Sequence, residues 1–298
     1  MIVSHLISGL GNQMFQFAAA YSLAKKKGTD WALDTTWYYQ NIEKMSPRLF
    51  ELASFGFPIK VATPEEIDYY THFGEHNVLE RVVRKIKSYE PYYKQKFYKE
   101  PHFHFDTNFW NASKDCYLYG FWQSDKYFDP YADEIRNIFK GKFPFNNANQ
   151  QVIHQIKDQN QTAVSVHIRR GDMVHNPEVM KIHGFCTLDY YLEASNYLLE
   201  RFKNVRFFVF SDEPEWCRAN FKPKADVIIV DHNQGLEGYN DIRLMAQCSH
   251  HIIPNSSFSW WGAWLNPNPN KIVIAPKRWF AIEGKDTKDL ISPNWIRL

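Results

Sequence analysis

Two adjacent arginines follow a strongly apolar run, and their side chains have the chemistry that binds phosphate. Residues 164–172 have the sequence VSVHIRRGD, so a predicted buried strand ends directly before Arg169, Arg170, Gly171 and Asp172. Arginine presents a rigid fork of N–H donors that matches phosphate oxygens, and it keeps its positive charge near neutral pH. We therefore expect Arg169 or Arg170 to hold a diphosphate leaving group. The alternative is an exposed ion pair with a nearby aspartate.

A second strand is predicted to lead into a helix at residues 252–259, which have the sequence IIPNSSFS. The first turn of a helix exposes unpaired backbone N–H groups, so a helix that begins beside Ser256 and Ser257 is a site for an anion. The alternative is that one serine only caps the helix, while Trp260, Trp261 and Trp264 belong to the core. The two interpretations are compatible.

The glycine turn at residues 9–14 has the sequence GLGNQM, which is similar to a dinucleotide-binding fingerprint. The fingerprint is incomplete, because Met14 stands where its third glycine would be. We expect instead that Asn12 and Gln13, at the start of the next predicted helix, contact a sugar or its acceptor.

The sequence predicts no metal site. It contains no Asp-x-Asp triplet and no His-Glu-x-x-His motif, and both are common sources of ligands for divalent cations. Its cysteines lack Cys-x-x-Cys spacing, which predicts reduced and mostly buried thiols at Cys116, Cys186, Cys217 and Cys248.

Length and charge set the broad class. A chain of 298 residues is long enough for two domains, and its formal charge of +2 lacks the basic excess of a nucleic-acid-binding protein. No signal peptide and no apolar run of about 20 residues occur, so we expect a cytoplasmic protein without a membrane span. The basic residues of segment 81–99 predict a solvated helix face, with a patch at the inner face of the membrane as the alternative.

The elements that must position these residues are short strands alternating with helices. Residues 2–8 and 29–34 predict strands on either side of a helix, and the pattern then loosens between residues 40 and 160. After a predicted linker at residues 145–150, strands at 162–168, 206–211, 226–231, 251–255 and 271–276 alternate with helices at 188–202, 213–221, 240–248 and 257–265. This alternation predicts an α/β fold with parallel sheets in two domains, residues 1–150 and 151–298.

Three stretches together resemble the bacterial α-1,2-fucosyltransferase family. They are GLGNQMFQFA at residues 9–18, HIRRGD at 167–172 and NSSFSWWGAWL at 255–265, and they occur in the family's order. The resemblance implies two Rossmann-like lobes that face each other across a cleft, the GT-B arrangement. It also implies GDP-fucose as a co-substrate, no cofactor, no metal ion, and inversion to an α-linked product.

The resemblance also assigns roles to single residues. In fucosyltransferases that share a His-x-Arg-Arg motif, the first arginine holds the β-phosphate and the histidine lies at the nucleotide, which implies these roles for Arg169 and His167. A carboxylate that opens a helix recognises guanine there, and Asp241 has the matching position here. The other residues expected to bind the donor are Arg170, Asp212, Asn255, Ser256 and Ser257, with Asp212 at the base or ribose.

The catalytic base has two candidates. Direct displacement requires the acceptor hydroxyl to lose its proton, so a carboxylate or histidine should lie near it. Some relatives carry a glutamate several residues after the double arginine, and the matching place here holds Pro177 with Glu178 beside it. Asp172 is the alternative, unless it only orients Arg169 or Arg170.

The sequence thus predicts a galactoside 2-α-L-fucosyltransferase. Its carboxyl-terminal lobe would bind GDP-fucose, and its amino-terminal lobe would receive a galactose-terminated glycan, a lipid-linked precursor included. The alternatives are an NAD-type oxidoreductase that uses the amino-terminal glycine turn, and a non-catalytic carbohydrate-binding protein, to which the 10 Trp, 17 Tyr and 23 Phe residues would be suited.

Overall fold

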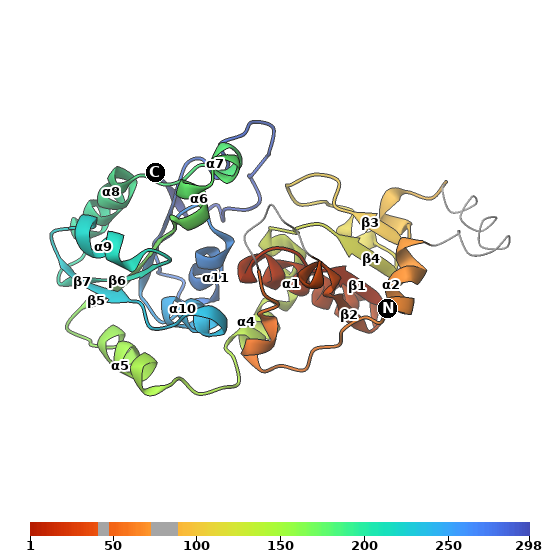
Figure 1. Ribbon diagram of the computed structural model, residues 1–298, viewed down its shortest axis with the longest axis horizontal. Helices are drawn as coiled ribbons and strands as arrows, with labels where there is room; N and C mark the ends of the chain where they lie inside the picture. The colour runs from red at the N-terminus through yellow and green to blue at the C-terminus, as the bar shows by residue number, and fades with distance from the viewer. Residues whose placement is uncertain (41–47, 73–88) are drawn as a thin grey trace. The chain divides into compact units, whose positions relative to one another are not determined.

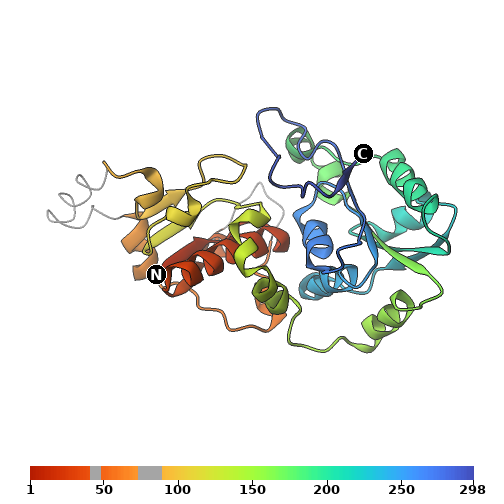
Figure 2. The same cartoon turned by 180° about the vertical axis from the view of Figure 1, so that it is seen from behind.

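A computed structural model of the protein describes residues 1–40, 48–72 and 89–298. Proximity of Cα atoms divides the chain into two compact units, which Figures 1 and 2 show from opposite sides. One unit comprises residues 1–53, 57–137 and 286–290, and the other comprises 54–56, 138–285 and 291–298. Each unit is described by itself.

The first unit is built on a parallel sheet with strand order β2-β1-β4-β3. The strands are β1 (Ile2–His5), β2 (Trp31–Asp34), β3 (Phe97–Lys99) and β4 (Cys116–Tyr119). The α-helices described in this part of the chain are α1 (Leu10–Lys27), α2 (Pro64–Thr71) and α4 (Ala132–Phe139), whose last two residues belong to the second unit. Helix α1 ends at Gly28, whose left-handed backbone (φ 61°) closes the helix with two backbone hydrogen bonds.

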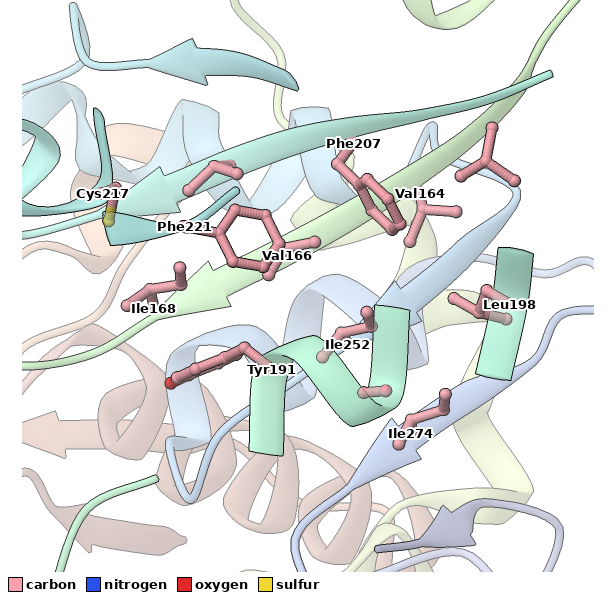
Figure 3. Close-up of a cluster of buried hydrophobic side chains, with 13 residues drawn as sticks. Val164, Val166, Ile168, Tyr191, Leu198, Phe207, Cys217, Phe221, Ile252 and Ile274 are labelled. Carbon is pink, nitrogen blue, oxygen red and sulfur yellow. The ribbon is translucent and has the colours of Figure 1, made fainter. Parts of the chain in front are cut away.

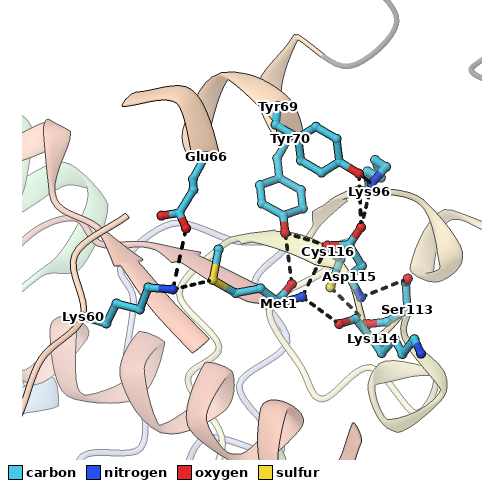
Figure 4. Close-up of polar contacts among 10 residues, drawn as sticks. All are labelled: Met1, Lys60, Glu66, Tyr69, Tyr70, Lys96, Ser113, Lys114, Asp115 and Cys116. Atoms are coloured by element: carbon cyan, nitrogen blue, oxygen red, sulfur yellow. Dashed lines mark hydrogen bonds and ion pairs between the residues drawn. The ribbon is translucent and has the colours of Figure 1, made fainter. Parts of the chain in front are cut away.

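A partly buried carboxylate joins three elements of this unit. Asp115, directly before β4, accepts hydrogen bonds of 2.6 Å from both Lys96 Nζ and the Tyr70 hydroxyl (Figure 4). Burial alone would raise the pKa of Asp115, but these two donors outweigh it and lower the pKa to about 2. The ionised carboxylate therefore fastens α2 and the segment before β3 to the start of β4.

The second unit is built on a larger parallel sheet with strand order β10-β9-β8-β5-β6-β7. Its strands are β5 (Thr162–Ile168), β6 (Val205–Ser211), β7 (Asp226–Val230), β8 (His250–Ile252), β9 (Val273–Ala275) and β10 (Ile296–Arg297). Its helices are α5 (Asn147–Ile156), α6 (Gly171–His175), α7 (Pro177–His183), α8 (Leu188–Leu199), α9 (Pro214–Asn220), α10 (Tyr239–Met245) and α11 (Ser257–Leu265).

The two faces of β5 have different roles. Val164, Val166 and Ile168 point into a buried apolar cluster with Tyr191 and Leu198 of α8 (Figure 3). Alternate residues of a strand face opposite sides of the sheet, so Ser165 and His167 point the other way, toward α11. The three tryptophans of α11 are buried, which agrees with the expectation that they belong to the core.

The strand order of the larger sheet reverses once. From β5 the chain moves outward to β6 and β7, whereas from β8 it moves in the opposite direction to β9 and β10, so the reversal lies between β5 and β8. In the smaller sheet the chain crosses from β2 to the far edge strand β3 and returns to β4, which lies beside β1. Ligands of open α/β sheets bind at such reversal points, outside the carboxyl ends of the strands.

The predicted α/β class with parallel sheets is confirmed, and β5 to β9 lie at or near the predicted positions. Two expectations need correction. Strands β3 and β4 lie in the stretch without a predicted pattern, and α5 begins at Asn147, inside the predicted linker, because the Asn146 side chain accepts a capping bond from the Asn149 amide. None of the described helices is both long and apolar enough to cross a membrane, and residues 81–88 of the basic segment lie outside the described residues. All four cysteines are unpaired.

Candidate functional site

Three neighbouring strands of the larger sheet bring polar residues to one edge. The strands β8, β5 and β6 are adjacent and parallel, so the segments that follow them begin at the same edge of the sheet. Arg169 and Arg170 follow β5, Asp212 follows β6, and Ser256 lies shortly after β8. The residues expected to bind a diphosphate therefore lie at the reversal of strand order.

Arg169 is held between two carboxylates. Its Nη2 lies 2.5 Å from Asp172 Oδ1, and its Nη1 lies 2.8 Å from Asp212 Oδ2. The side chains of all three residues are between 19% and 24% exposed, so the ion pairs are largely shielded from water. A guanidinium has five N–H donors, and these two contacts use two of them.

Arg170 has different surroundings. Its Nε donates to Glu213 Oε2 at 2.8 Å, and its guanidinium lies 3.8 Å from the centre of the Trp216 ring. Glu213 also lies 2.7 Å from His175 Nε2, and the hydrogen bonds from Arg170 and His175 outweigh burial and lower the pKa of this carboxyl. Arg170 therefore connects the end of β5 to α9.

The charge of this cluster is not positive. Arg169 and Arg170 face the three carboxylates of Asp172, Asp212 and Glu213. An anionic ligand would therefore be held by directed N–H donors rather than by an excess of positive charge.

His167 is buried on the face of the sheet that α11 covers. Its ring centre lies 5.4 Å from that of Phe258, and Nδ1 has no hydrogen-bond partner among the described residues. Burial, together with the charge of Arg169, lowers the pKa of His167 to about 3, so the imidazole is neutral at physiological pH. A buried polar atom without a partner costs free energy, and a ligand that supplies the partner would recover it.

The start of α11 has the features expected of an anion site. Ser256 is the residue that precedes the helix, and its side chain makes no capping hydrogen bond to the first turn. Asn255 differs from its neighbours, because it is 4% exposed and its Nδ2 donates to the backbone oxygens of His183 at 2.8 Å and Trp279 at 3.1 Å. Asn255 therefore fastens loops, whereas Ser256 and Ser257 remain partly exposed.

Asp241 lies in the first turn of α10, and its carboxylate accepts a hydrogen bond from a side-chain amide. Its Oδ1 accepts from Asn233 Nδ2 at 2.8 Å. Burial raises the pKa of Asp241 to about 7, and the single amide donor offsets only part of this effect. The amide pair Asn149–Asn233 behind it was not predicted from the sequence, and its two members come from α5 and the loop after β7.

The two candidate bases lie in different surroundings. Asp172 belongs to the Arg169 cluster, whereas Glu178 is 79% exposed and pairs with Lys181 at 3.1 Å within α7. A third titratable group, His183 at the end of α7, was not among the residues predicted for the site. Burial, with a smaller effect of Lys285, lowers its pKa, while Asp172 acts in the opposite direction.

In the first unit, Asn12 and Gln13 hold the loop after β1. Gln13 is fully buried and donates to the backbone oxygens of Ser8 at 3.1 Å and Leu49 at 2.8 Å. Asn12 donates to Ser8 Oγ at 2.9 Å and accepts from Gln123 Nε2, which follows β4. The bond between Asn12 and Gln123 joins the segments that follow the neighbouring strands β1 and β4.

No group of three or more His, Cys, Asp or Glu side chains in the described part of the chain could hold a metal ion.

The sequence profile of glycosyl transferase family 11 matches this chain over residues 1–298. The chain is 34% identical over 304 residues to an α-1,2-colitosyltransferase of Escherichia coli, with 100% of this chain and 99% of that protein covered. It is 33% identical over 309 residues to the O-antigen biosynthesis glycosyltransferase WbnK of Escherichia coli, with 99% of each covered. A galactoside α-(1,2)-fucosyltransferase 1 of Leontocebus fuscicollis is 31% identical over 156 residues, which cover 50% of this chain and 42% of that protein.

Proposed function

The chain belongs to glycosyl transferase family 11, and we propose that this glycosyltransferase moves L-fucose from GDP-β-L-fucose to the 2-hydroxyl of a terminal β-galactoside, with inversion to an α-1,2 linkage. The observation that carries the proposal is the position of Arg169 and the uncapped start of α11 at the reversal of strand order. The names of the relatives support the linkage and the class of acceptor.

Different residues at the edge of the larger sheet bind different groups of the donor. Arg169 binds the β-phosphate through N–H donors other than the two that its carboxylate partners use, and the amides of Ser256 and Ser257 bind the same diphosphate. Asp241 accepts the N1–H and N2–H donors of guanine. His167, whose Nδ1 lacks a partner in the described chain, lies at the nucleotide.

The reaction forms one bond and breaks one. The acceptor hydroxyl oxygen attacks the anomeric carbon of fucose while the bond to the β-phosphate oxygen breaks, and GDP leaves with the negative charge that Arg169 stabilises. The hydroxyl proton passes to a carboxylate, either Asp172 or Glu178. Replacing each by its amide distinguishes them, since loss of the base lowers kcat far more than donor affinity.

A second donor is favoured by one observation, the 34% identity to an α-1,2-colitosyltransferase over the full chain. Colitose is L-fucose without its 3-hydroxyl group, so GDP-colitose presents the same guanine and diphosphate to the site. A site that hydrogen-bonds the 3-hydroxyl rejects the deoxy sugar strongly, because its own polar groups would be left unpaired. A site built for colitose discriminates less.

The two-lobe GT-B arrangement is part of the proposal. The carboxyl-terminal lobe, residues 151–298, binds the nucleotide, and the amino-terminal lobe, residues 1–150, receives the acceptor across a cleft. Gln13 and Asn12 shape the acceptor side by fixing the loop after β1. The reaction takes place in the cytoplasm, where a lipid-linked glycan at the inner face of the membrane is one acceptor.

The test offers purified protein a panel of β-galactoside acceptors with GDP-fucose or GDP-colitose, and the product linkage is determined by NMR. We expect an α-1,2-linked product and higher kcat/KM with GDP-fucose. Higher kcat/KM with GDP-colitose would establish the second donor. Binding of NAD but not of GDP in calorimetry, or GDP binding without turnover of any sugar, would contradict the proposal.

A further inference from the structure

The carboxylate of Asp212 meets three consecutive residues of the loop after β5. Its Oδ2 lies 2.8 Å from Arg169 Nη1, and its Oδ1 accepts the Arg170 backbone N–H at 3.0 Å. Gly171 is the third residue, and a Cβ atom added to it would lie 2.3 Å from Asp212 Oδ2. The carboxylate can approach this loop so closely only because residue 171 has no side chain.

The ends of β5 and β6 are tied together beneath this contact. Ile168 and Ser211, the last residues of the two strands, are paired in register. Ser211 Oγ donates to the Ile168 backbone oxygen at 2.7 Å and accepts the Glu213 backbone N–H at 3.0 Å. The position of Asp212 is therefore fixed relative to the sheet.

The two partners of Arg169 differ in what they can fix. Asp172 lies three residues further along the chain, in the short helix α6, so it can move together with Arg169. Asp212 directly follows the neighbouring strand β6 and holds both the guanidinium and the next backbone N–H. Only the contact with Asp212 relates the arginine to the rigid sheet.

We infer that Asp212 is a positioning residue for Arg169, not a contact of the base or ribose, and that Gly171 is required for this role. The inference rests on the proposed function of Arg169 at the leaving diphosphate. An arginine that is already oriented loses little side-chain freedom when the transition state forms, so its donors stabilise the developing charge without reorganisation.

The test is a double-mutant cycle that measures kcat and the dissociation constant of GDP for wild type, Asp212→Asn, Arg169→Lys and the double variant. We expect Asp212→Asn to lower kcat on the order of 30-fold, with a smaller change in GDP affinity. In the Arg169→Lys background, Asp212→Asn should lower kcat less than about threefold, because the guanidinium that Asp212 positions is gone. A purely structural role would lower activity equally in both backgrounds, and this result would overturn the inference.

Two further variants extend the test, and circular dichroism first establishes that each is folded, because the backbone of Gly171 (φ 21°) disfavours a residue with a side chain. Gly171→Ala leaves every charge in place, and its Cβ should displace the Asp212 carboxylate and lower kcat as Asp212→Asn does. Asp226→Asn is the matched control, since Asp226 is 74% exposed and pairs with Arg206 at the other end of the sheet. Normal kcat in Gly171→Ala would overturn the inference.

The outcomes separate the inference from the function on which it rests. If wild type transfers a different sugar, the proposed donor is wrong. The same double-mutant cycle, run with that sugar, still tests whether Asp212 positions Arg169. If Arg169→Lys has normal kcat, the leaving-group role of Arg169 is wrong, and the inference is overturned with it. If Arg169→Lys has a low kcat, and the double variant loses kcat by the product of the two single losses, only the inference is wrong.

Discussion

Asn233 donates a 2.8 Å hydrogen bond to Asp241, while its amide group also pairs with that of Asn149 through bonds of 2.9 and 2.8 Å. The amide pair aims the carboxylate but brings no positive charge to it. The pKa of Asp241 is consequently raised to about 7 by burial, so its ionisation changes within the physiological range.

The first prediction concerns GDP affinity and pH. The ionised carboxylate accepts the two guanine N–H donors, whereas its protonated form accepts them poorly, so GDP binding should strengthen as pH rises through about 7 and then level off. Asp241→Asn should weaken binding by about 1–3 kcal/mol at high pH and flatten this part of the profile. Calorimetry across this range measures both effects.

The phosphate groups of GDP also titrate near this range. The dependence of GDP affinity on pH that remains in Asp241→Asn is the part that these phosphates contribute. Asp226→Asn, which removes an exposed carboxylate of β7, should keep the wild-type profile. Equal pH dependence in wild type and Asp241→Asn would move the guanine site elsewhere.

The second prediction concerns stability without ligand. The pKa of Asp241 is higher in the folded protein than its ordinary value of 3.8, so the folded state binds this proton more tightly than the unfolded state. This contribution to stability is fully present below pH 3.8 and is lost as pH rises through about 7. Raising the pH across this range should therefore lower the Tm of wild type more than that of Asp241→Asn. An unchanged Tm difference between the two proteins would show that Asp241 titrates normally.

The third prediction separates Asn255 from its serine neighbours. Asn255→Ala leaves the backbone oxygens of His183 and Trp279 without their donor, so it should reduce the free energy of unfolding by about 1–3 kcal/mol. Ser257→Ala should instead weaken GDP binding and leave Tm nearly unchanged. Denaturation and calorimetry on both variants provide the comparison. If Asn255→Ala has normal stability but binds GDP weakly, Asn255 contacts the donor.

The regular alternation in the second half of the chain made most of its sheet predictable. Buried parallel strands have continuous apolar sequences, and the run Phe207–Phe210 of β6 shows this directly. Strand β3 has only three residues, and its outer two, Phe97 and Lys99, are exposed, so no such run marks it. The polar sequence of α5 concealed a helix whose Asn149 is buried because it pairs with a residue 84 positions away.

The site was predictable to the level of single segments. The predicted strand ends that carry arginine or serine share one edge of the sheet, because parallel strands present their carboxyl ends together. The partners of Arg169 and Arg170 were not predictable, since the contacts of Asp212 and Glu213 depend on the register between β5 and β6. A one-residue shift would have placed these side chains on the opposite face.

The fourth prediction concerns divalent cations. The sequence lacks the Asp-x-Asp pair, and the resemblance to fucosyltransferases implies that arginine and backbone donors hold the diphosphate. Transfer from GDP-fucose should therefore proceed at an unchanged rate in excess EDTA. A loss of activity that magnesium or manganese restores would show that a cation completes the donor site.

The last prediction concerns Arg169, whose contribution should be larger in the transition state than in the bound donor, because charge grows on the β-phosphate as the glycosidic bond breaks. Lysine keeps the positive charge but cannot contact Asp172, Asp212 and a phosphate with one planar group. Arg169→Lys should thus lower kcat on the order of a hundredfold, about 3 kcal/mol, and change the GDP-fucose dissociation constant much less.

Arg170→Lys is the matched control for this change. It loses the contacts with Glu213 and Trp216, so its main effect should be on stability rather than on kcat. Circular dichroism on both variants establishes that each is folded before kcat and donor affinity are compared. If instead Arg170→Lys loses kcat while Arg169→Lys retains it, Arg169 is an ion-pair residue of the sheet edge. The leaving group would then be held by Arg170 or by the amides at Ser256 and Ser257, which do not depend on side-chain charge.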